Sequence, residues 1–99
     1  MTLRLVIEPS AKADIIVARD WYEAQRPGLE REFRDELAAV FRRIESNPLG
    51  IAIVHRDVRQ IGLKRFPYVV SFIVRDDSLF VIAILHGRRD ETTWQDRID

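Results

Sequence analysis

The sequence contains no cysteine, which excludes disulfide bonds and a catalytic thiolate. Metal-binding motifs are also lacking, because the two histidines, His55 and His86, lie too far apart to form one. The longest apolar run is well short of the roughly 20 residues that span a bilayer, and the N-terminus lacks the apolar stretch of a signal peptide. We therefore expect a soluble cytoplasmic protein without a metal, a cofactor or a membrane partner.

The chain also lacks an excess of either charge. Sixteen Lys and Arg residues offset sixteen Asp and Glu residues, so composition predicts neither direct binding of nucleic acid nor an acidic mimic of DNA. This balance hides a local asymmetry, since residues 8–46 hold nine acids and seven bases, whereas residues 55–75 hold one acid and five bases. The five bases are Arg56, Arg59, Lys64, Arg65 and Arg75.

Two apolar segments in the basic half predict a β-hairpin. In residues 68–74 the apolar residues alternate on one face, as in a strand with one buried side. Residues 79–85 are all apolar, which predicts a central strand covered on both faces, and the polar residues 76–78 favour a tight turn between the two. On this pattern Tyr68 begins the buried face of the first strand. In the second strand, one face is shared by His86, Ile82 and Ile84.

Residues 3–48 predict a strand followed by two helices. Alternation in residues 3–8 indicates the strand, and Ser10 is suited to cap the first helix through its hydroxyl. The first helix has an apolar stripe, widened by Trp21, of Ala11, Ile15, Ala18 and Tyr22. Residues 26–28 interrupt it. The second helix, which ends at residues 46–48, has a stripe of Leu29, Phe33, Leu37, Val40, Phe41 and Ile44. So short a connection predicts an antiparallel helical hairpin.

The remaining segments complete a single domain. Residues 50–56 fit either an irregular link or a short strand, and residues 58–65 fit a strand that leads into a turn at residues 64–67. The tail after Asp90 is mostly polar, with Trp94 as its large apolar anchor. No repeat or linker divides the 99 residues. We therefore expect an α+β domain of order β-α-α-β-β-β, in which an N-terminal helical hairpin packs on an antiparallel sheet.

Three stretches of the chain resemble a known family: ADIIVARDWYEAQRPGLEREFRDEL, VRQIGLKRFPYVVSFIV and VIAILHGRRDETTW. Their succession is similar to the ParE branch of the RelE/ParE superfamily, the toxin components of bacterial type II toxin-antitoxin modules, also called plasmid stabilisation systems. The most specific parts are RFPY at residues 65–68 and HGRRD at residues 86–90. The resemblance extends from about Leu3 to Trp94 and implies the family fold, a RelE/ParE-like antiparallel sheet with an N-terminal helical hairpin.

The resemblance implies one of two targets. RelE-like members are ribosome-dependent endoribonucleases that cut mRNA, whereas ParE-like members are described as poisons of DNA gyrase, which reach nucleic acid only through the target complex. Both kinds are held inactive by a cognate antitoxin, here expected to be ParD-like and encoded adjacently. RelE-like sites commonly place a Tyr or His base near the C-terminus, but this chain has neither after Asp90. We favour a gyrase poison that does not break bonds itself. The alternatives are a ribonuclease and a degenerate toxin that only binds its antitoxin.

Three groups of candidate residues follow from the basic run and the resemblance. Residues expected to contact the target are Arg56, Arg59, Lys64, Arg65, His86, Arg88 and Arg89. In a ribonuclease, the residues that stabilise the phosphate or move protons would be Lys64, Arg65, Tyr68, His86 and Arg88. Residues expected to contact the antitoxin are Trp21, Tyr22, Leu29 and Phe33. Each candidate also has an interpretation without function. The Lys and Arg residues can be ordinary solvated surface charges, and the aromatic side chains and His86 can serve in packing.

Overall fold

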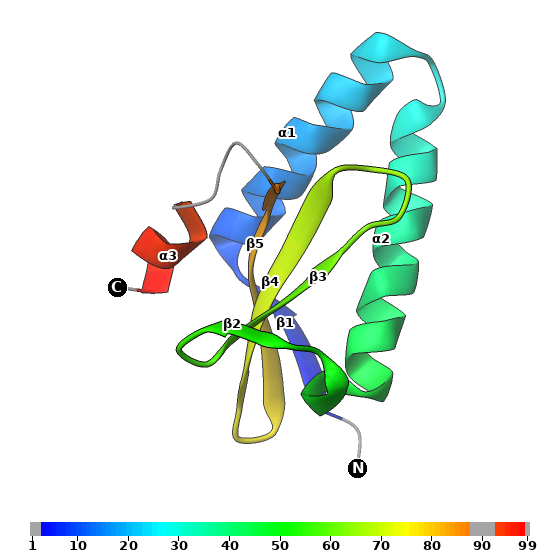
Figure 1. Ribbon diagram of the computed structural model, residues 1–99. Coiled ribbons are helices and arrows are strands. Elements are labelled where there is room, and N and C mark those ends of the chain that lie inside the picture. The colour runs from blue at the N-terminus through cyan, green and yellow to red at the C-terminus, as the bar shows by residue number, and fades with distance from the viewer. Residues whose placement is uncertain (1–2, 88–92, 99) are drawn as a thin grey trace.

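Two long helices cover one face of a sheet in the computed structural model, which describes residues 3–87 and 93–98 (Figure 1). The chain begins with strand β1 (Arg4–Ile7) and continues into the hairpin of helices α1 (Pro9–Gln25) and α2 (Leu29–Ser46). A 3-10 turn, η1 (Pro48–Gly50), precedes strands β2 (Ile53–His55), β3 (Val58–Gly62), β4 (Tyr68–Arg75) and β5 (Ser78–His86). A short helix, α3 (Thr93–Ile98), follows.

The five described strands form one mixed sheet in the order β1-β5-β4-β3-β2. Neighbours from β2 to β5 are antiparallel, whereas β1 lies parallel to β5, with Arg4 opposite Ser78 and Ile7 opposite Val81. The α+β class and the helical hairpin are therefore confirmed, but the expectation of a wholly antiparallel sheet is wrong for β1. Sequence periodicity indicates which face of a strand is buried and carries no information on the direction of its partner.

The segment between α2 and β4 differs from the expected single strand. Residues 50–56, which fit a link or a strand, contain the end of η1 and the three-residue strand β2. Strand β3 ends at Gly62, short of the predicted end at Arg65. The chain leaves the sheet there because the backbone amides of Lys64 and Arg65 donate to the carboxylate of Glu36 on α2.

The main core lies between the helical hairpin and the sheet. Its buried members from the helices are Ala11, Ala18, Tyr22, Phe33, Leu37, Val40 and Ile44. They pack against strand residues that include Val70, Phe72, Leu79, Val81 and Ile84. The apolar stripes predicted for both helices are thus confirmed, with Ile15, Leu29 and Phe41 half-buried at the margin. Trp21 does not widen the buried stripe of α1, because its side chain faces solvent.

Helix α1 begins one residue earlier than its expected cap. Pro9 occupies the first turn, where a missing N–H costs nothing, and Glu8 takes the extended conformation of the N-cap residue. The prediction that Ser10 caps the helix is therefore wrong. The Ser10 hydroxyl lies inside α1 and donates to the backbone carbonyl of Ile82 on β5 at 3.3 Å.

A bulge in β5 divides the apolar run between two cores. Ser71 on β4 is opposite Ala83, but the next residue, Phe72, is opposite Val81, so Ile82 is an extra residue in β5. Val81 therefore packs in the main core, whereas Ile82 and Ala83 point to the other face of the sheet. Ile84 faces the helices again. The prediction that Ile82 shares a face with Ile84 is wrong because an extra residue reverses the alternation of side chains.

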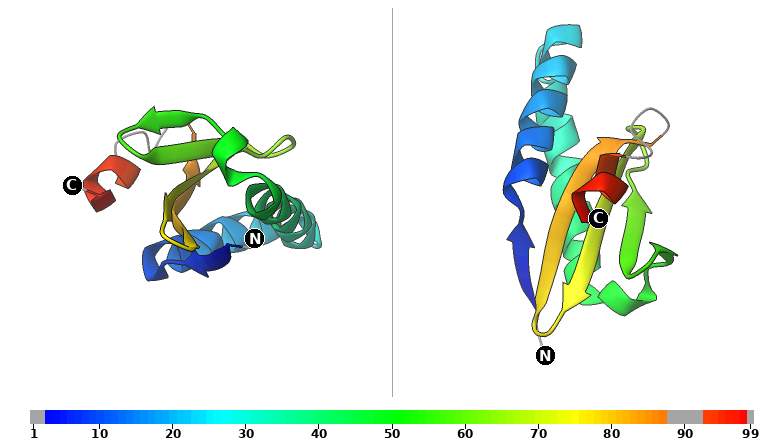
Figure 2. Two further views of the ribbon diagram at one scale, coloured as in Figure 1. Left: turned by 90° about the horizontal axis from the view of Figure 1, so that it is seen from below. Right: turned by 90° about the vertical axis from the view of Figure 1, so that its left-hand side faces the viewer.

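A second core covers part of the sheet face that lies away from the helical hairpin. Trp94 of α3 packs there with Val58, Ile82 and Ala83. Its ring also meets that of His55 edge-on, with centroids 5.6 Å apart. In Figure 2 (left), β4 and β5 lie between α3 on one side and α2 on the other. The polar tail thus contains a helix that the sequence analysis does not predict, and Trp94 is its buried anchor, as expected.

Candidate functional site

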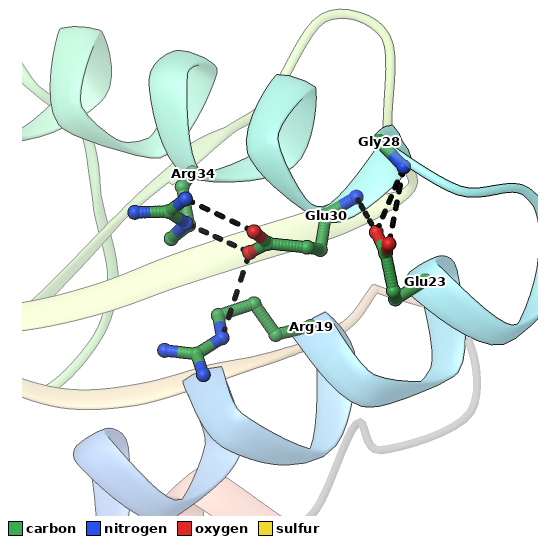
Figure 3. Close-up of polar contacts among 5 residues, drawn as sticks. All are labelled: Arg19, Glu23, Gly28, Glu30 and Arg34. Carbon is green, nitrogen blue, oxygen red and sulfur yellow. Dashed lines mark hydrogen bonds and ion pairs between the residues drawn. The ribbon is translucent and has the colours of Figure 1, made fainter.

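One carboxylate closes the connection between α1 and α2 (Figure 3). Gly28 adopts the left-handed conformation, with φ of 89°, which a residue without a side chain takes at little cost. The Glu23 carboxylate accepts hydrogen bonds from the backbone N–H groups of Gly28 at 3.1 Å and of Glu30 at 3.3 Å. These amides lie at the N-terminal end of α2, where no intrahelical acceptor is available. Glu23 therefore caps α2 from the neighbouring helix.

Glu30 contacts two arginines, one on each helix of the hairpin. Its carboxylate accepts hydrogen bonds from Arg34 on the same helix at 2.7 and 2.9 Å, and it lies 3.6 Å from Nε of Arg19 on α1. The hydrogen bonds from Arg34, together with the positive charge of both guanidiniums, lower the pKa of Glu30. The contact with Arg19 joins the surfaces of the two helices, whereas the buried stripe of Ala11, Ala18 and Tyr22 determines which side of α1 faces the core.

The exposed surface of α1 carries three large apolar residues. Ile16, Val17 and Trp21 are 52%, 69% and 53% exposed, and we call them the α1 apolar face. Single exposed apolar residues are ordinary on a protein surface, but Val17 and Trp21 are four residues apart and therefore neighbours on the helix surface, which is more typical of a contact site. Trp21, a predicted antitoxin contact, is thus placed where a partner can reach it.

Ile16 and Val17 are members of this face that the sequence analysis does not nominate. The signal for them is the run Ile15-Ile16-Val17. Successive residues of a helix point about 100° apart, so three in a row cannot all face the core. Ile15 packs against the main core, and the other two point outward.

The other predicted antitoxin contacts lie in or beside the core. Tyr22 is 7% exposed and Phe33 is fully buried, and their rings pack 5.3 Å apart. Phe66 and Tyr68 complete this aromatic group, with centroid distances to Tyr22 of 4.8 and 5.9 Å. Leu29 is half-buried against the same core. Direct contact of Tyr22 or Phe33 with a partner does not fit this burial, because a core position removes the side chain from the surface.

Lys64 and Arg65 lie in a loop that α2 holds in place. The Arg65 guanidinium donates to Glu32 at 2.6 Å and lies over the Phe66 ring. Hydrogen bonds from Arg65 and Arg26 lower the pKa of Glu32, and the bond to Glu32 raises the pKa of Arg65. The charge of Arg65 is thus balanced within the fold, whereas the Lys64 ammonium has no ion pair among the described residues.

Arg56 and Arg59 lie apart from that loop. Arg59 is opposite Phe72, four residues along β4 from Tyr68, or about 13 Å at the usual strand spacing. Its guanidinium donates to the backbone carbonyls of Leu49 at 3.2 Å and Ile51 at 2.6 Å, which secures the segment after α2. Arg56 lies in the β2–β3 turn with φ of 53°. The basic run is therefore two groups in space and not one.

Tyr68 and His86 meet at one end of the sheet. They are directly opposite across β4 and β5, and their rings are 5.9 Å apart in an edge-on arrangement. Two backbone hydrogen bonds of 2.9 Å, from Leu63 to Tyr68 and from Gly87 to Pro67, join the loop that contains Lys64 to the same end. The structure therefore brings together Tyr68 and His86 of the hypothetical ribonuclease set, and it places the loop of Lys64 and Arg65 at the same end of the sheet. Arg88 and Arg89 lie outside the described residues.

Within residues 3–87 and 93–98, no group of three or more His, Asp or Glu side chains is placed to hold a metal ion. No helix there is long and apolar enough to cross a membrane.

Comparisons with known proteins agree with the fold and with the resemblance. Residues 5–91 match the family model described as the ParE toxin of the type II toxin-antitoxin system parDE. The chain is 28% identical over 88 residues to the proteins named Toxin ParE2 in two strains of Mycobacterium tuberculosis, an alignment covering 88% of this chain and 84% of theirs.

A solved structure shares the fold. It is described as a chromosomal ParDE system from P. aeruginosa, and it superposes with a TM-score of 0.76 at 18% identity, over 85% of this chain and 95% of that one. Because the family model spans most of the sequence, from residue 5 to residue 91, the protein belongs to the ParE toxin family of type II toxin-antitoxin systems.

Proposed function

We propose that this ParE-family toxin inhibits growth by binding DNA gyrase and stalling its cleaved-DNA complex, and that a cognate ParD-like antitoxin neutralises it. The ParE branch that the chain resembles is described as acting on gyrase. In this account the toxin supplies a binding surface, and gyrase breaks the DNA. The protein then needs no general base or acid of its own.

The observation that carries this proposal is the placement of Tyr68 and Arg65. The Tyr68 ring packs against Phe33 with centroids 5.5 Å apart, as part of the aromatic group in the core. The Arg65 guanidinium is bound to the Glu32 carboxylate. A ribonuclease would need the first group free to move a proton and the second free to stabilise a phosphate. Both side chains instead hold the loop and the sheet against α2.

The α1 apolar face supports the antitoxin part of the proposal. An amphipathic helix of a partner can cover Ile16, Val17 and Trp21, as helices commonly do when they bind apolar grooves and ridges. The two outer strands of the sheet, β1 and β2, leave room for an added strand as a second mode of binding. Covering these surfaces stabilises the folded toxin, since the partner binds only the folded state.

The ribonuclease remains the second candidate, and one contact favours it. His86 is beside Tyr68 and on the same end of the sheet as Lys64, whose ammonium has no ion pair among the described residues. An imidazole at the same end of the sheet as a cation is an arrangement that suits RNA cleavage. Replacing His86 with Ala distinguishes the ribonuclease from the gyrase poison. A ribonuclease that uses it loses roughly 10²-fold in activity, whereas a gyrase poison keeps its effect.

The target is tested with purified components. Supercoiled plasmid, gyrase and the toxin are incubated together, and the expected product is linear plasmid that appears only when all three are present. Primer extension on translated mRNA after induction should show intact message. Codon-dependent cleavage together with the absence of linear plasmid would replace the gyrase proposal with the ribonuclease.

The antitoxin contact is tested by replacing Trp21 with Ala and Val17 with Glu, one at a time. Each change should weaken binding of the adjacently encoded antitoxin by roughly 30-fold or more, as at other interface hot spots. The matched control is Arg42→Ala on α2, whose exposed side chain has no partner among the described residues. Titration calorimetry measures the affinity. Equal affinities for all three variants would show that the antitoxin binds elsewhere.

A further inference from the structure

A groove lies on the sheet face that is turned away from the helical hairpin. It has a volume of about 730 Å³, within the roughly 300–1,000 Å³ of ordinary ligand sites. Its walls are the start of α1 on one side, from Glu8 to Ser10, and Arg97 and Ile98 of α3 on the other. It shares no lining residue with the α1 apolar face.

The floor of the groove is apolar. Ile73 of β4 and Phe80 of β5 are direct cross-strand neighbours, and Ile82 stands beside them at the bulge. Ile73 and Phe80 are only half-buried, because Ile73 packs at the margin of the second core and Phe80 is not part of it. Two large side chains of the sheet thus remain partly open to solvent, and covering them would be favourable.

On the rim of the groove, the basic side chains have charged partners and the acidic side chains have none in the described part of the chain. Both arginines already have carboxylate partners: Arg75 donates to Asp57 at 3.0 Å, and Arg97 donates to Asp14 at 2.7 and 3.0 Å. The two acids of the rim, Glu8 and Asp76, have no hydrogen bond or ion pair from their carboxylates among the described residues. A ligand that enters the groove therefore meets an apolar floor and two unpaired negative charges.

We propose that this groove binds a basic and apolar segment of a partner protein, with apolar side chains on Ile73 and Phe80 and a Lys or Arg at Glu8 and Asp76. Charge complementarity selects this occupant, because an acidic segment would face two carboxylates without a free cation on the rim. An open groove with an apolar floor suits an extended or helical segment of a polypeptide.

The test uses two short labelled peptides that share an apolar centre of Leu, Ile and Val. One has Lys at both ends and the other has Glu at both ends. Fluorescence anisotropy with the full-length protein should give an affinity for the Lys peptide about tenfold higher than for the Glu peptide, as expected for two exposed ion pairs of usual strength. The difference should shrink in high salt, which screens exposed charges.

Two variants separate the rim from the floor. The double variant Glu8→Gln and Asp76→Asn keeps the shape of the groove and should abolish the preference for Lys. Asn readily takes the left-handed backbone of Asp76, whose φ is 55°. The Phe80→Ala variant should weaken binding of both peptides, with circular dichroism melts to establish that it is folded. The matched control, Glu45→Gln, removes an unpaired acid that lies outside this groove and should change nothing.

The result that overturns the proposal is an equal affinity of the protein for the two peptides. Unchanged Lys-peptide binding in both groove variants would also overturn it. This test is independent of the proposed function, since neither peptide binding nor these variants involve gyrase, the antitoxin or the α1 apolar face.

Discussion

The carboxylate of Asp14 and the guanidinium of Arg97 form a two-pronged ion pair at 2.7 and 3.0 Å, although 83 residues separate them in sequence. Their side chains are only 10% and 24% exposed. Asp14 also accepts a hydrogen bond from the backbone amide of Ile84, and Arg97 donates to the carbonyl of Ile82. The pair therefore closes the edge of β5 beyond the point where β1 ends and fastens α3 to α1.

Replacing Asp14 with Ala should lower the free energy of unfolding by about 2–3 kcal/mol, because it leaves the mostly buried Arg97 without its counterion and the backbone amide of Ile84 without its acceptor. Urea unfolding monitored by circular dichroism measures the change. The control is Asp20→Ala on the same helix, an exposed acid without a partner in the described chain, which should stay within about 0.5 kcal/mol of the parent. Equal effects of the two substitutions would contradict the role given to Asp14.

Stability should decrease in acid, because the pKa values of Glu30 and Glu32 lie below their ordinary value of 4.5 in the folded protein. A carboxyl whose pKa is lowered by folding stabilises the protein above its ordinary pKa, and this contribution disappears as the pH falls through the lowered value. The double variant Glu30→Gln and Glu32→Gln should be less stable than the parent at pH 7, and the difference should narrow below about pH 4.

Urea midpoints at both pH values measure this effect, and added salt should reduce it, since all the charges involved are exposed. Glu45→Gln, which removes an acid without a partner among the described residues, is the control. If the difference in urea midpoint between the parent and the double variant stays constant with pH, these ion pairs do not stabilise the fold.

Gly28→Ala should lower the free energy of unfolding by about 1–2 kcal/mol through backbone strain. An added Cβ would meet no atom within 4 Å, so the cost comes from the φ of 89° and not from a clash. Gly28→Asn should cost less, since Asn takes this conformation more readily. Gly62→Ala is the control, because its Cβ would make an ordinary 3.9 Å contact with the Tyr68 carbonyl oxygen. A melting temperature unchanged in Gly28→Ala would rule out the strain.

Replacing both Arg88 and Arg89 with Ala should remove toxicity and leave the fold intact. These residues, which lie outside the described part of the chain, follow the last strand in the HGRRD motif. Substitution of a solvent-exposed charge usually changes stability by about 0.5 kcal/mol or less, so the melts test whether the loss of toxicity occurs in a folded protein. Growth arrest after induction and melts of the purified proteins are the two measurements. The double control Arg42→Ala and Arg43→Ala removes an equal charge from α2. Full toxicity of the Arg88 and Arg89 variant would direct attention to Arg56, Arg59 and Lys64.

The helical hairpin could be predicted from sequence because its signal is local. The stripe from Leu29 to Ile44 repeats at the helical period, and Pro27 with Gly28 marks the turn. The bulge at Ile82 has no such signal, because residues 79–85 are all apolar. A strand with the bulge and a strand without it would both place apolar side chains toward the core. The pairing of β1 with β5 depends on contacts across nearly the whole chain, which periodicity does not encode.

The candidate site was harder to predict than the fold. Charge in sequence did not reveal that Glu32 balances Arg65 or that Arg59 binds carbonyl groups, because both partners are distant in the chain or lie in the backbone. Helix α3 did have a signal, the apolar pair Trp94 and Ile98 at a spacing of four. Two apolar residues are too weak a pattern to predict a helix of this length, which is stabilised by the packing of Trp94 on the second face of the sheet.

The parallel contact between β1 and β5 sets an order of events during synthesis. Of the described strands, β1 comes first in the chain and pairs with β5, which comes last, so Arg4 lacks its partner Ser78 until β5 has emerged from the ribosome. Domains gain stability only when such distant contacts form, and a nascent chain presents its apolar surfaces until then. The helical hairpin can form early, but its apolar side stays exposed until the sheet has formed. The fold of residues 4–86 is therefore complete only after β5 has been synthesised.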